Sequence, residues 1–437
     1  MLHAKPVRQI TRRRTHRLSL VIGCGLSLGA LTPALAAPPS NIKATLNVVR
    51  FGDENDVKTV GLMIQRFHKR YPNVTVKVQR FTAANGWPEY LSNVMNLIAS
   101  GNPPDILDMP LEGVSTVASR GLMLDLDALA AKDGQAKELL NDVEPNIINS
   151  MRYNKQLVFF PTAWNNIVIY YNKGAFKKAG LQPPSSTWTW DDFLKAAQKL
   201  TVRDAKGKVT QYGYYVPAYG FGLTPWFLTN GTDKLTPDWR RSNVKDPRFR
   251  ESLQFLHDLI YKYKVSPAFQ AGAGESAFVS QQAAMISIGH WPIASFVKSF
   301  KDFDVAVVPR KTASNTVFGG EGNGILKTSK NPELAWEFIK ELTSKQSQAE
   351  LAGAGLAIPA RRSAASLPAF LNFPANSGIF YGSAKTAVPI ASPPNFSQVE
   401  DILMRNVTAY MTNNQTLDAA LNNMDRELTR SLSRVKW

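Results

Sequence analysis

Three segments decide the fold class of this chain: Ala44–Phe51 (ATLNVVRF), Val74–Phe81 (VTVKVQRF) and Asp105–Met109 (DILDM). Each is rich in the aliphatic and aromatic residues that favour strands. Between them, Asp56–Tyr71 and Trp87–Ser100 carry apolar residues at helical spacing. Strands that alternate with helices in this way predict parallel pairing with crossover helices, and therefore an open α/β sheet.

The rest of the chain continues this alternation. Leu157–Phe160 and Ile167–Tyr171 are apolar runs of strand length. Thr189–Asp192 (TWDD) has the pattern of a capping box, and Asn331–Glu333 (NPE) has the cap residue and early proline of another helix start. The length of 437 residues is typical of two or three domains.

Residues 1–36 have the parts of a secretion signal. Six basic residues and no acid precede an apolar run from Leu18 to Leu35, which ends at the cleavage pattern Ala34-Leu35-Ala36. Cleavage after Ala36 shortens the chain from 437 to 401 residues and lowers the net charge from +17 to +11, because all six basic residues leave. We therefore predict export to the periplasm, by the general secretory or the twin-arginine route.

One alternative to simple cleavage lies inside the same segment. Val21–Cys24 (VIGC) resembles a lipoprotein box, in which Cys24 would be acylated and would anchor the protein to a membrane. The apolar stretch before it, Leu18–Ile22, is shorter than the usual seven residues or more. The sequence favours cleavage after Ala36 over this anchor.

Composition argues against several classes of site. One cysteine excludes a disulfide framework and a zinc site built from cysteines, and no two of the five histidines have metal-ligand spacing on a helix. The basic residues are scattered and do not interleave with aromatic residues, which indicates a solvated basic surface and no nucleic-acid partner. We predict no bound metal and no cofactor.

No catalytic motif is present either. The chain has no G-x-S-x-G elbow and no P-loop, and the glycine-rich stretch Gly319–Gly324 lacks the dinucleotide-binding spacing. We therefore predict that the protein is not an enzyme. A pair of glycosidase carboxylates stays open, because such a pair has no local sequence signature.

Aromatic residues are the prominent chemical feature, with 9 Trp, 13 Tyr and 22 Phe. Several stand beside Gly, Asn or Pro at the ends of segments. An aromatic ring packs on the apolar face of a sugar while amides and carboxylates bind its hydroxyls, so this set favours a sugar site. The aromatics that belong to it are Trp164, Tyr219, Phe221, Trp226 and Trp291. We assign Trp188, Trp190, Trp239 and Trp336 to packing.

One segment resembles a family signature. Pro161–Lys173 (PTAWNNIVIYYNK), continued by Phe176–Leu181, closely resembles the signature of family 1 extracellular solute-binding proteins of ABC transporters, the family that includes maltose-binding protein. Thr162 departs from the aliphatic residue or alanine usual at that position. Further resemblances follow in family order at Ser100–Ile106, Gly121–Leu126, Thr187–Thr201, Gln282–Trp291, Val307–Pro309, Asn331–Leu342 and Ile358–Arg361, although Gln281-Gln282 replace the usual Gly-Lys.

The resemblance implies two α/β lobes joined by crossing segments, with the ligand in the cleft between them. The crossings are expected near Thr162–Asn165, Val307–Pro309 and Leu356–Pro359. Lobe 1 would then comprise residues 37–162 and 307–356, and lobe 2 residues 163–306 and 357–437.

The implied function is that of a monomeric substrate-binding protein of an ABC importer, which binds a carbohydrate and delivers it to a membrane permease. Three other ligands stay open within the same fold: a phosphorylated polyol, an acidic oligosaccharide or a metal ion. A secreted carbohydrate-active enzyme is the alternative from another class, and two carboxylates facing the cleft would favour it.

The resemblance also points to site residues. Trp291 stands where the family has a sugar-stacking Trp, and Asn165 stands where the maltose-binding relative has a Glu that contacts sugar. Gly319 and Gly320 would let the backbone approach the ligand closely. The remaining expected ligand contacts are Asp53, Glu54, Trp164, Tyr219, Trp226, Asp108, Glu321 and Arg361.

Overall fold

The computed structural model describes residues 37–52, 54–82 and 86–437, without the side chains of residues 54 and 55. The predicted signal peptide, the lipoprotein box at Cys24 and the predicted ligand contact at Asp53 lie outside the described residues. Glu54 is described only as the first residue of helix α1.

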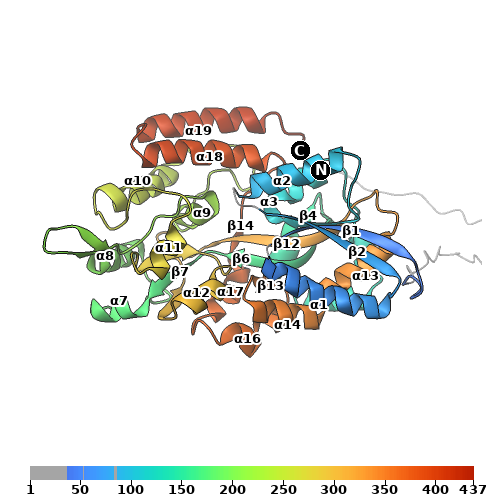
Figure 1. Ribbon diagram of the computed structural model, residues 1–437. Coiled ribbons are helices and arrows are strands. Elements are labelled where there is room, and N and C mark those ends of the chain that lie inside the picture. Colours follow the sequence, from blue (N-terminus) through green and yellow to red (C-terminus); the bar gives the residue numbers. More distant parts are fainter. Residues whose placement is uncertain (1–36, 53, 83–85) are drawn as a thin grey trace, which may run out of the picture. The chain divides into compact units, whose positions relative to one another are not determined.

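The larger sheet begins with the predicted alternation of strands and helices. Strands β1 (Ala44–Phe51), β2 (Val74–Phe81) and β3 (Ile106–Pro110) are parallel, with β1 paired to both others. Helices α1 (Glu54–Arg70) and α2 (Trp87–Ala99) are the crossovers, and they cover opposite faces of the sheet (Figure 1). The β-α-β-α-β prediction is confirmed, and it places the carboxyl ends of β1 and β3 at one edge.

Strands from later in the chain complete this sheet. Its order is β13-β6-β12-β3-β1-β2, with β14 (Val388–Pro389) beside β12. Strand β12 (Val317–Ile325) runs antiparallel to β3 and to β6 (Phe160–Asn166), and β13 (Ile358–Pro359) forms the other edge. The glycine-rich stretch is therefore a central strand.

Two glycines of β12 are required by packing. A Cβ at Gly322 would lie 2.9 Å from the Phe160 carbonyl oxygen, and one at Gly324 would lie 2.6 Å from that of Val158. The register shifts at Glu321/Gly322, opposite Pro161, and a bulge is a position where a strand tolerates proline. The predicted strand at residues 157–160 thus lies later, at residues 160–166.

The smaller sheet has the order β10-β7-β11, formed by Met285–Ile288, Val168–Asn172 and Phe303–Ala306. All its pairs are antiparallel, and single parallel bridges add Tyr212 and Tyr215 beside β10. Only Ile167 separates β6 from β7, so the chain passes directly from the larger sheet into the smaller one.

Helices and short strands fill the remaining chain. The helices are α3 Leu111–Ala118, α4 Asp127–Ala130, α5 Gly134–Asn141, α6 Pro145–Ser150, α7 Lys173–Lys178, α8 Trp190–Leu200, α9 Gly220–Leu228, α10 Pro247–Tyr261, α11 Gly274–Val279, α12 Ile293–Ser299, α13 Pro332–Leu342, α14 Lys345–Ala354, α15 Arg362–Ala365, α16 Pro368–Leu371, α17 Gly378–Gly382, the 3₁₀ turn η1 Ser383–Lys385, α18 Phe396–Met411 and α19 Leu417–Leu432. The short strands are β4 Arg152–Tyr153, β5 Gln156–Leu157, β8 Val202–Arg203 and β9 Val209–Gln211. The capping box at Thr189 and the helix start after Asn331 are both confirmed.

Two hydrophobic cores support the two sheets. The first packs around the larger sheet, and the second gathers side chains of α8, α9, α10, α18 and α19. Strand β7 contributes to both by alternation: Val168 and Tyr170 belong to the first core, and Ile169 and Tyr171 to the second. The smaller sheet therefore lies between the cores. The exact lobe boundaries drawn from the sequence stay predictions.

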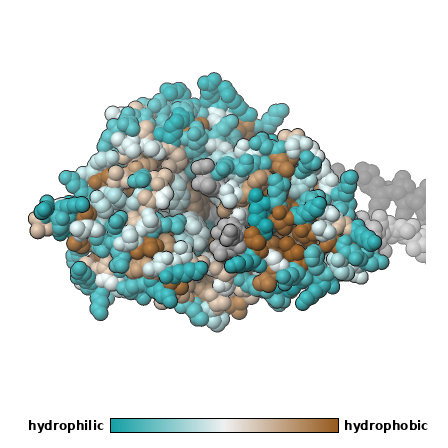
Figure 2. Space-filling model, viewed as in Figure 1, coloured by the Kyte–Doolittle hydropathy of each residue, from teal (hydrophilic) through white to brown (hydrophobic). Residues whose placement is uncertain are grey.

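The molecular surface is largely hydrophilic on the face drawn in Figure 2. In the described part of the chain, no helix is both long enough and apolar enough to span a bilayer.

Candidate ligand-binding site

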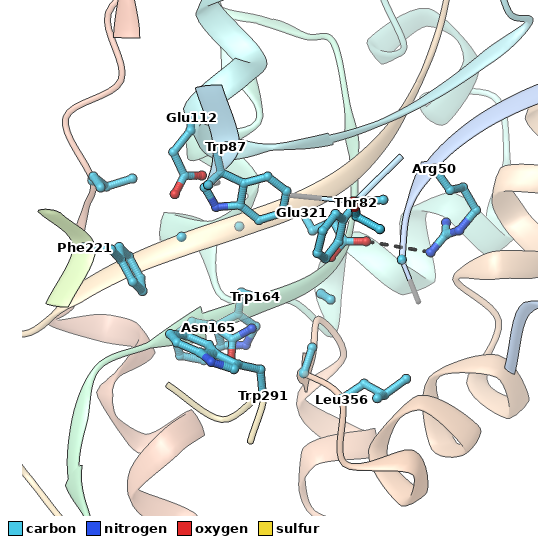
Figure 3. Close-up of a pocket in the computed structure, with 18 of the residues that line it drawn as sticks. Arg50, Thr82, Trp87, Glu112, Trp164, Asn165, Phe221, Trp291, Glu321 and Leu356 are labelled. Atoms are coloured by element: carbon cyan, nitrogen blue, oxygen red, sulfur yellow. Dashed lines mark ion pairs between the residues drawn. The ribbon is translucent and has the colours of Figure 1, made fainter. Parts of the chain in front are cut away.

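A cavity of about 1010 Å³ opens at the edge where β1 and β3 end (Figure 3). Residues from both hydrophobic cores and from β6, β12, α9, α14 and α18 line it. Open α/β sheets bind ligands outside the carboxyl ends of their strands, so the position agrees with the fold. The volume is typical of sites for small organic molecules.

Trp291 forms one aromatic wall of the cavity. Its ring lies 6.4 Å from that of Phe221, and its Nε1–H donates to Glu275 Oε1 at 3.3 Å. A Cβ at Gly289 would collide with the indole, so the glycine two residues earlier lets the ring lie over the backbone. The local sequence Gly289-His290-Trp291 thus fixes the orientation of this side chain.

A second aromatic group lines the wall beside β1. Phe51, the last residue of β1, packs edge-on against Trp87 at 4.6 Å, and both line the cavity. Trp87 begins helix α2, whose Pro88 stands in the first turn. Sequence reasoning placed Trp87 in a helix and did not recognise it as a site residue, although it stands at the first residue after a loop.

Asn165 connects the larger sheet to the turn that carries Trp291. It lies on β6 and lines the cavity, and its Oδ1 accepts the His290 N–H at 3.1 Å. Its neighbour Asn166 points the other way into the protein, where its amide donates to Phe380 O at 3.0 Å. Alternation along the strand therefore leaves the Asn165 amide group beside the cavity.

Arg50 near the end of β1 is the centre of a buried ion cluster. Its Nη2 lies 3.1 Å from Asp56, 3.7 Å from Asp108 and 3.7 Å from Glu321. Burial opposes the charge on Arg50, yet the three carboxylates outweigh it and raise the pKa of the guanidinium. Burial also raises the pKa of Asp108 and of Glu321, in both cases against the effect of Arg50.

Two further carboxylates line the cavity near α9. Glu112 on α3 is only 3% exposed, and burial raises its pKa to about 7. Burial likewise raises the pKa of Glu400 on α18, with Lys234 opposing the shift. Glu112 is the second residue after β3, and ligands of open α/β sheets bind at the carboxyl ends of strands, so its position was the available sequence signal for it. Glu400 carried no such sequence signal, because only the tertiary fold brings α18 to the cavity.

Several predicted site residues meet at this cavity. Trp164, Asn165, Tyr219, Trp291, Gly319, Gly320 and Glu321 all line it. Trp164 is only 1% exposed and packs edge-on against Phe318 and Tyr381, so most of its surface serves packing. A Cβ at Gly320 would approach Met151 within 2.5 Å, which shows that this glycine is needed for packing as well.

Three predicted site residues do not line the cavity, and each has a structural explanation. Trp226 is fully buried in the second core, with its Nε1–H donated to Tyr214. Arg361 is buried and donates to the Thr343 carbonyl at 2.9 Å, with Glu138 as an ion-pair partner. Asp108 is fully buried and lies behind the lining residues Arg50 and Glu321, with which it interacts.

Among the residues that the structure describes, no group of three or more His, Cys, Asp or Glu side chains is arranged to hold a metal ion.

Curated relatives are about a quarter identical to this chain over the aligned residues. The arabinooligosaccharide-binding protein of Bacillus subtilis is 27% identical over 299 residues, which cover 63% of this chain and 64% of that protein. The sn-glycerol-3-phosphate-binding periplasmic protein UgpB of Brucella abortus is 22% identical over 244 residues, covering 54% and 56%. The chain thus matches less than two thirds of the length of either relative.

Solved structures share the fold over nearly the whole described chain. An ABC substrate-binding protein of Listeria monocytogenes in complex with cycloalternan has a TM-score of 0.79 at 23% identity, covering 90% of this chain and all of that one. Maltose-bound MalE3 of T. maritima has a TM-score of 0.75 at 22% identity, covering 89% and 100%. The fold is therefore the two-lobed α/β fold of maltose-binding-type proteins.

The family assignment rests on a match to a family model. Residues 52–349, more than half of the chain, match the sequence model described as "Bacterial extracellular solute-binding protein". The chain belongs to the bacterial extracellular solute-binding protein family.

Proposed function

We propose that this protein is the extracytoplasmic substrate-binding component of an ABC importer, and that it binds a carbohydrate in the cavity. One observation supports this most strongly: Trp291, Phe221 and Trp87 share the cavity wall with Asn165 and carboxylates. Rings that pack on a pyranose face, together with amide and carboxylate groups for its hydroxyls, are what a sugar needs. The arabinooligosaccharide-binding relative and the structures with cycloalternan and maltose agree with this ligand class, whereas the UgpB relative is named for sn-glycerol-3-phosphate.

The charge of the cavity argues against an anionic ligand. Among the described lining residues, Arg50 is the only basic one, and three carboxylates already surround it. Five acidic residues line the same space: Asp56, Glu112, Glu321, Glu400 and Asp401. A phosphorylated polyol or an acidic oligosaccharide would meet like charge there, which is unfavourable in a partly buried site.

A carbohydrate-active enzyme is the second candidate, because Glu112 and Glu400 both line the cavity and have raised pKa values. Raised carboxyl pKa values are common to catalytic acids and to ligand sites. The two functions differ in turnover. Prolonged incubation of the protein with a bound sugar should return the intact sugar, and catalytic depletion of that sugar would establish the enzyme instead.

The direct test of binding is a thermal-shift screen against neutral and charged sugars. A ligand present at 100 times its dissociation constant stabilises the folded state by about 2.7 kcal/mol. The same sugar should give a much smaller shift with Trp291→Ala. A panel in which no sugar shifts the melting temperature would contradict the proposal.

Export and partners form the remaining part of the proposal. The exported protein should begin at Ala37, and intact-mass measurement after expression with residues 1–36 tests this. An acylated N-terminus at Cys24 would instead place the protein on a membrane. We propose that the mature protein is a monomer that delivers its ligand to a membrane permease.

A further inference from the structure

We propose that Glu112 and Glu400 form a cation-accepting subsite of the cavity, and that the preferred ligand is a sugar carrying a protonated amine. This proposal rests on the proposed carbohydrate-binding function and specifies the ligand class. It concerns the end of the cavity bordered by α3, α9 and α18, where Figure 3 shows Glu112 extending into the space between Trp87 and Phe221.

Neither carboxylate is satisfied by the described part of the protein. Glu112 is 97% buried, yet its side chain is held only by its own backbone N–H, and no described residue pairs with it. Glu400 Oε1 accepts the Gly220 N–H at 3.1 Å, while its Oε2 is buried without a donor. Leaving carboxylates buried without partners is costly, and such groups are typical of sites that bind a ligand.

The two nearby cations, Arg50 and Lys234, form no ion pair with either glutamate. Arg50 is surrounded by its three carboxylates. Lys234 is fully buried, its ammonium lies 3.9 Å from Asp233 without a hydrogen-bond partner, and it forms no ion pair with Glu112 or Glu400. Against the effect of burial, Lys234 lowers the pKa of both glutamates, whereas Asp233 raises that of Glu400 by a smaller effect. The negative charge of the two glutamates is therefore only partly compensated within the described protein.

Two glycines shape the space around this pair. A Cβ at Gly220 would collide with the Glu400 carboxylate, so only glycine lets that carboxylate reach the backbone N–H. A Cβ at Gly319 would lie 3.6 Å from Glu112 Oε1 and 3.5 Å from Phe221. The Glu112 carboxylate and the Phe221 ring therefore border the same volume.

This arrangement suits an ammonium group on a sugar ring. A ring packed against Phe221 and Trp291 would place a substituent within reach of Glu112. An ammonium there would gain two charge-assisted contacts and favourable interactions with the aromatic faces. A neutral hydroxyl would donate a single hydrogen bond and would leave the pair without a cation in direct contact.

The test compares matched sugars that differ only in an amine. Isothermal titration at pH 7 would use glucosamine with glucose, galactosamine with galactose, mannosamine with mannose, and the β-1,4-linked glucosamine disaccharide with cellobiose. We expect the amine member of at least one pair to bind about tenfold or more tightly than its hydroxyl partner, a difference of about 1.4 kcal/mol.

Variants then assign the preference to the two glutamates. Glu112→Gln and Glu400→Gln, measured separately in case one fails to fold, should each reduce the amine advantage to about threefold or less. Asp418→Asn is the matched control, because it removes the same charge from a side chain that is 73% exposed and outside the cavity. It should retain the full preference, and ligand-free melting confirms folding of each variant.

Three results would overturn the inference, and they differ in what they say of the function. If neutral sugars bind and the amines have no advantage, the subsite is an acceptor of hydroxyls and the carbohydrate-binding function stands. If neither member of any pair binds, the proposed function fails together with the inference. An amine preference that persists in both glutamine variants would place the cation elsewhere.

Discussion

Trp291 and Trp226 stand in similar sequence surroundings but have opposite environments. Trp226 is fully buried, and the rings of Trp190, Phe193 and Tyr214 lie 5.0–5.7 Å away. The ring of Trp291 is only partly buried and borders the cavity. An aromatic residue near glycine or asparagine therefore indicates a segment end, whereas the packing around the ring decides between core and site.

The largest expected effect is on stability and concerns Trp226, the tryptophan in the core. Trp226→Ala should lower the free energy of unfolding by about 3–5 kcal/mol, because it leaves a large cavity in the second core. Denaturant unfolding without ligand measures this. Affinity at a ligand concentration that keeps the variant folded should be unchanged. Lost affinity at unchanged stability would move Trp226 into the binding site.

The acidic residues give a second contrast, between Glu112 and Asp127. Burial raises the pKa of Glu112 to about 7 in the folded protein, from 4.5, and Glu400 faces it with Lys234 nearby. Between about pH 4.5 and pH 7, Glu112 therefore holds a proton in the folded state that it has lost in the unfolded state. The free energy of unfolding falls as the pH rises through this range. The loss is on the order of 3 kcal/mol, because one pKa unit corresponds to about 1.36 kcal/mol.

Urea unfolding at pH 5 and pH 8 tests this contribution. Glu112→Gln should flatten the decline of stability between the two values, since the amide does not titrate. The hydrogen bond to Arg152 lowers the pKa of Asp127, so its carboxylate is ionised in both states across this range. Asp127→Asn should therefore leave the pH dependence unchanged, and equal slopes in wild type and Glu112→Gln would disprove the assignment.

Trp291, the tryptophan that lines the cavity, is expected to affect binding. Trp291→Ala should weaken sugar binding by at least about tenfold, since truncation of a central aromatic contact typically costs about 2 kcal/mol. Ligand-free melting should change little because the ring is only partly buried. Trp291→Phe should recover part of the affinity by restoring an aromatic face. A large drop in melting temperature with unchanged affinity would make Trp291 structural.

The sequence predicted local structure well where local chemistry determines it. The strands and helices of residues 44–109 and the capping box at Thr189 follow from periodicity and cap residues, and they are present as expected. Gly319 and Gly320 were predicted to let the backbone approach the ligand, and both line the cavity. The place of Gly322 and Gly324 in a central strand, where neighbouring carbonyls leave no room for a Cβ, depends on partners that only the fold supplies.

The site was predictable only where the local sequence carries a signal. Trp291 and Asn165 belong to segments that carry family resemblance, and both line the cavity. Arg50 is the penultimate residue of β1, and Glu112 is the second residue after β3. A search for charged residues at the carboxyl ends of strands would therefore have identified both. Glu400 lies on a helix whose local sequence gives no indication of the cavity.

The smallest expected effect separates two adjacent asparagines on β6. Asn165→Ala removes the acceptor of the His290 N–H and the amide donors beside the cavity, so binding should weaken by about three- to tenfold, in line with about 0.5–1.5 kcal/mol for one net hydrogen bond. Asn165→Asp keeps the acceptor for His290 and removes only the donors. A loss in both variants therefore assigns the effect to contact with ligand, and a loss in Asn165→Ala alone assigns it to the position of the turn that holds Trp291.

Asn166→Ala is the control, because the Asn166 amide is fully buried and donates to Phe380 O. It should lower stability and leave affinity unchanged, whereas equal binding losses at both positions would mean that alternation along β6 does not separate site from core.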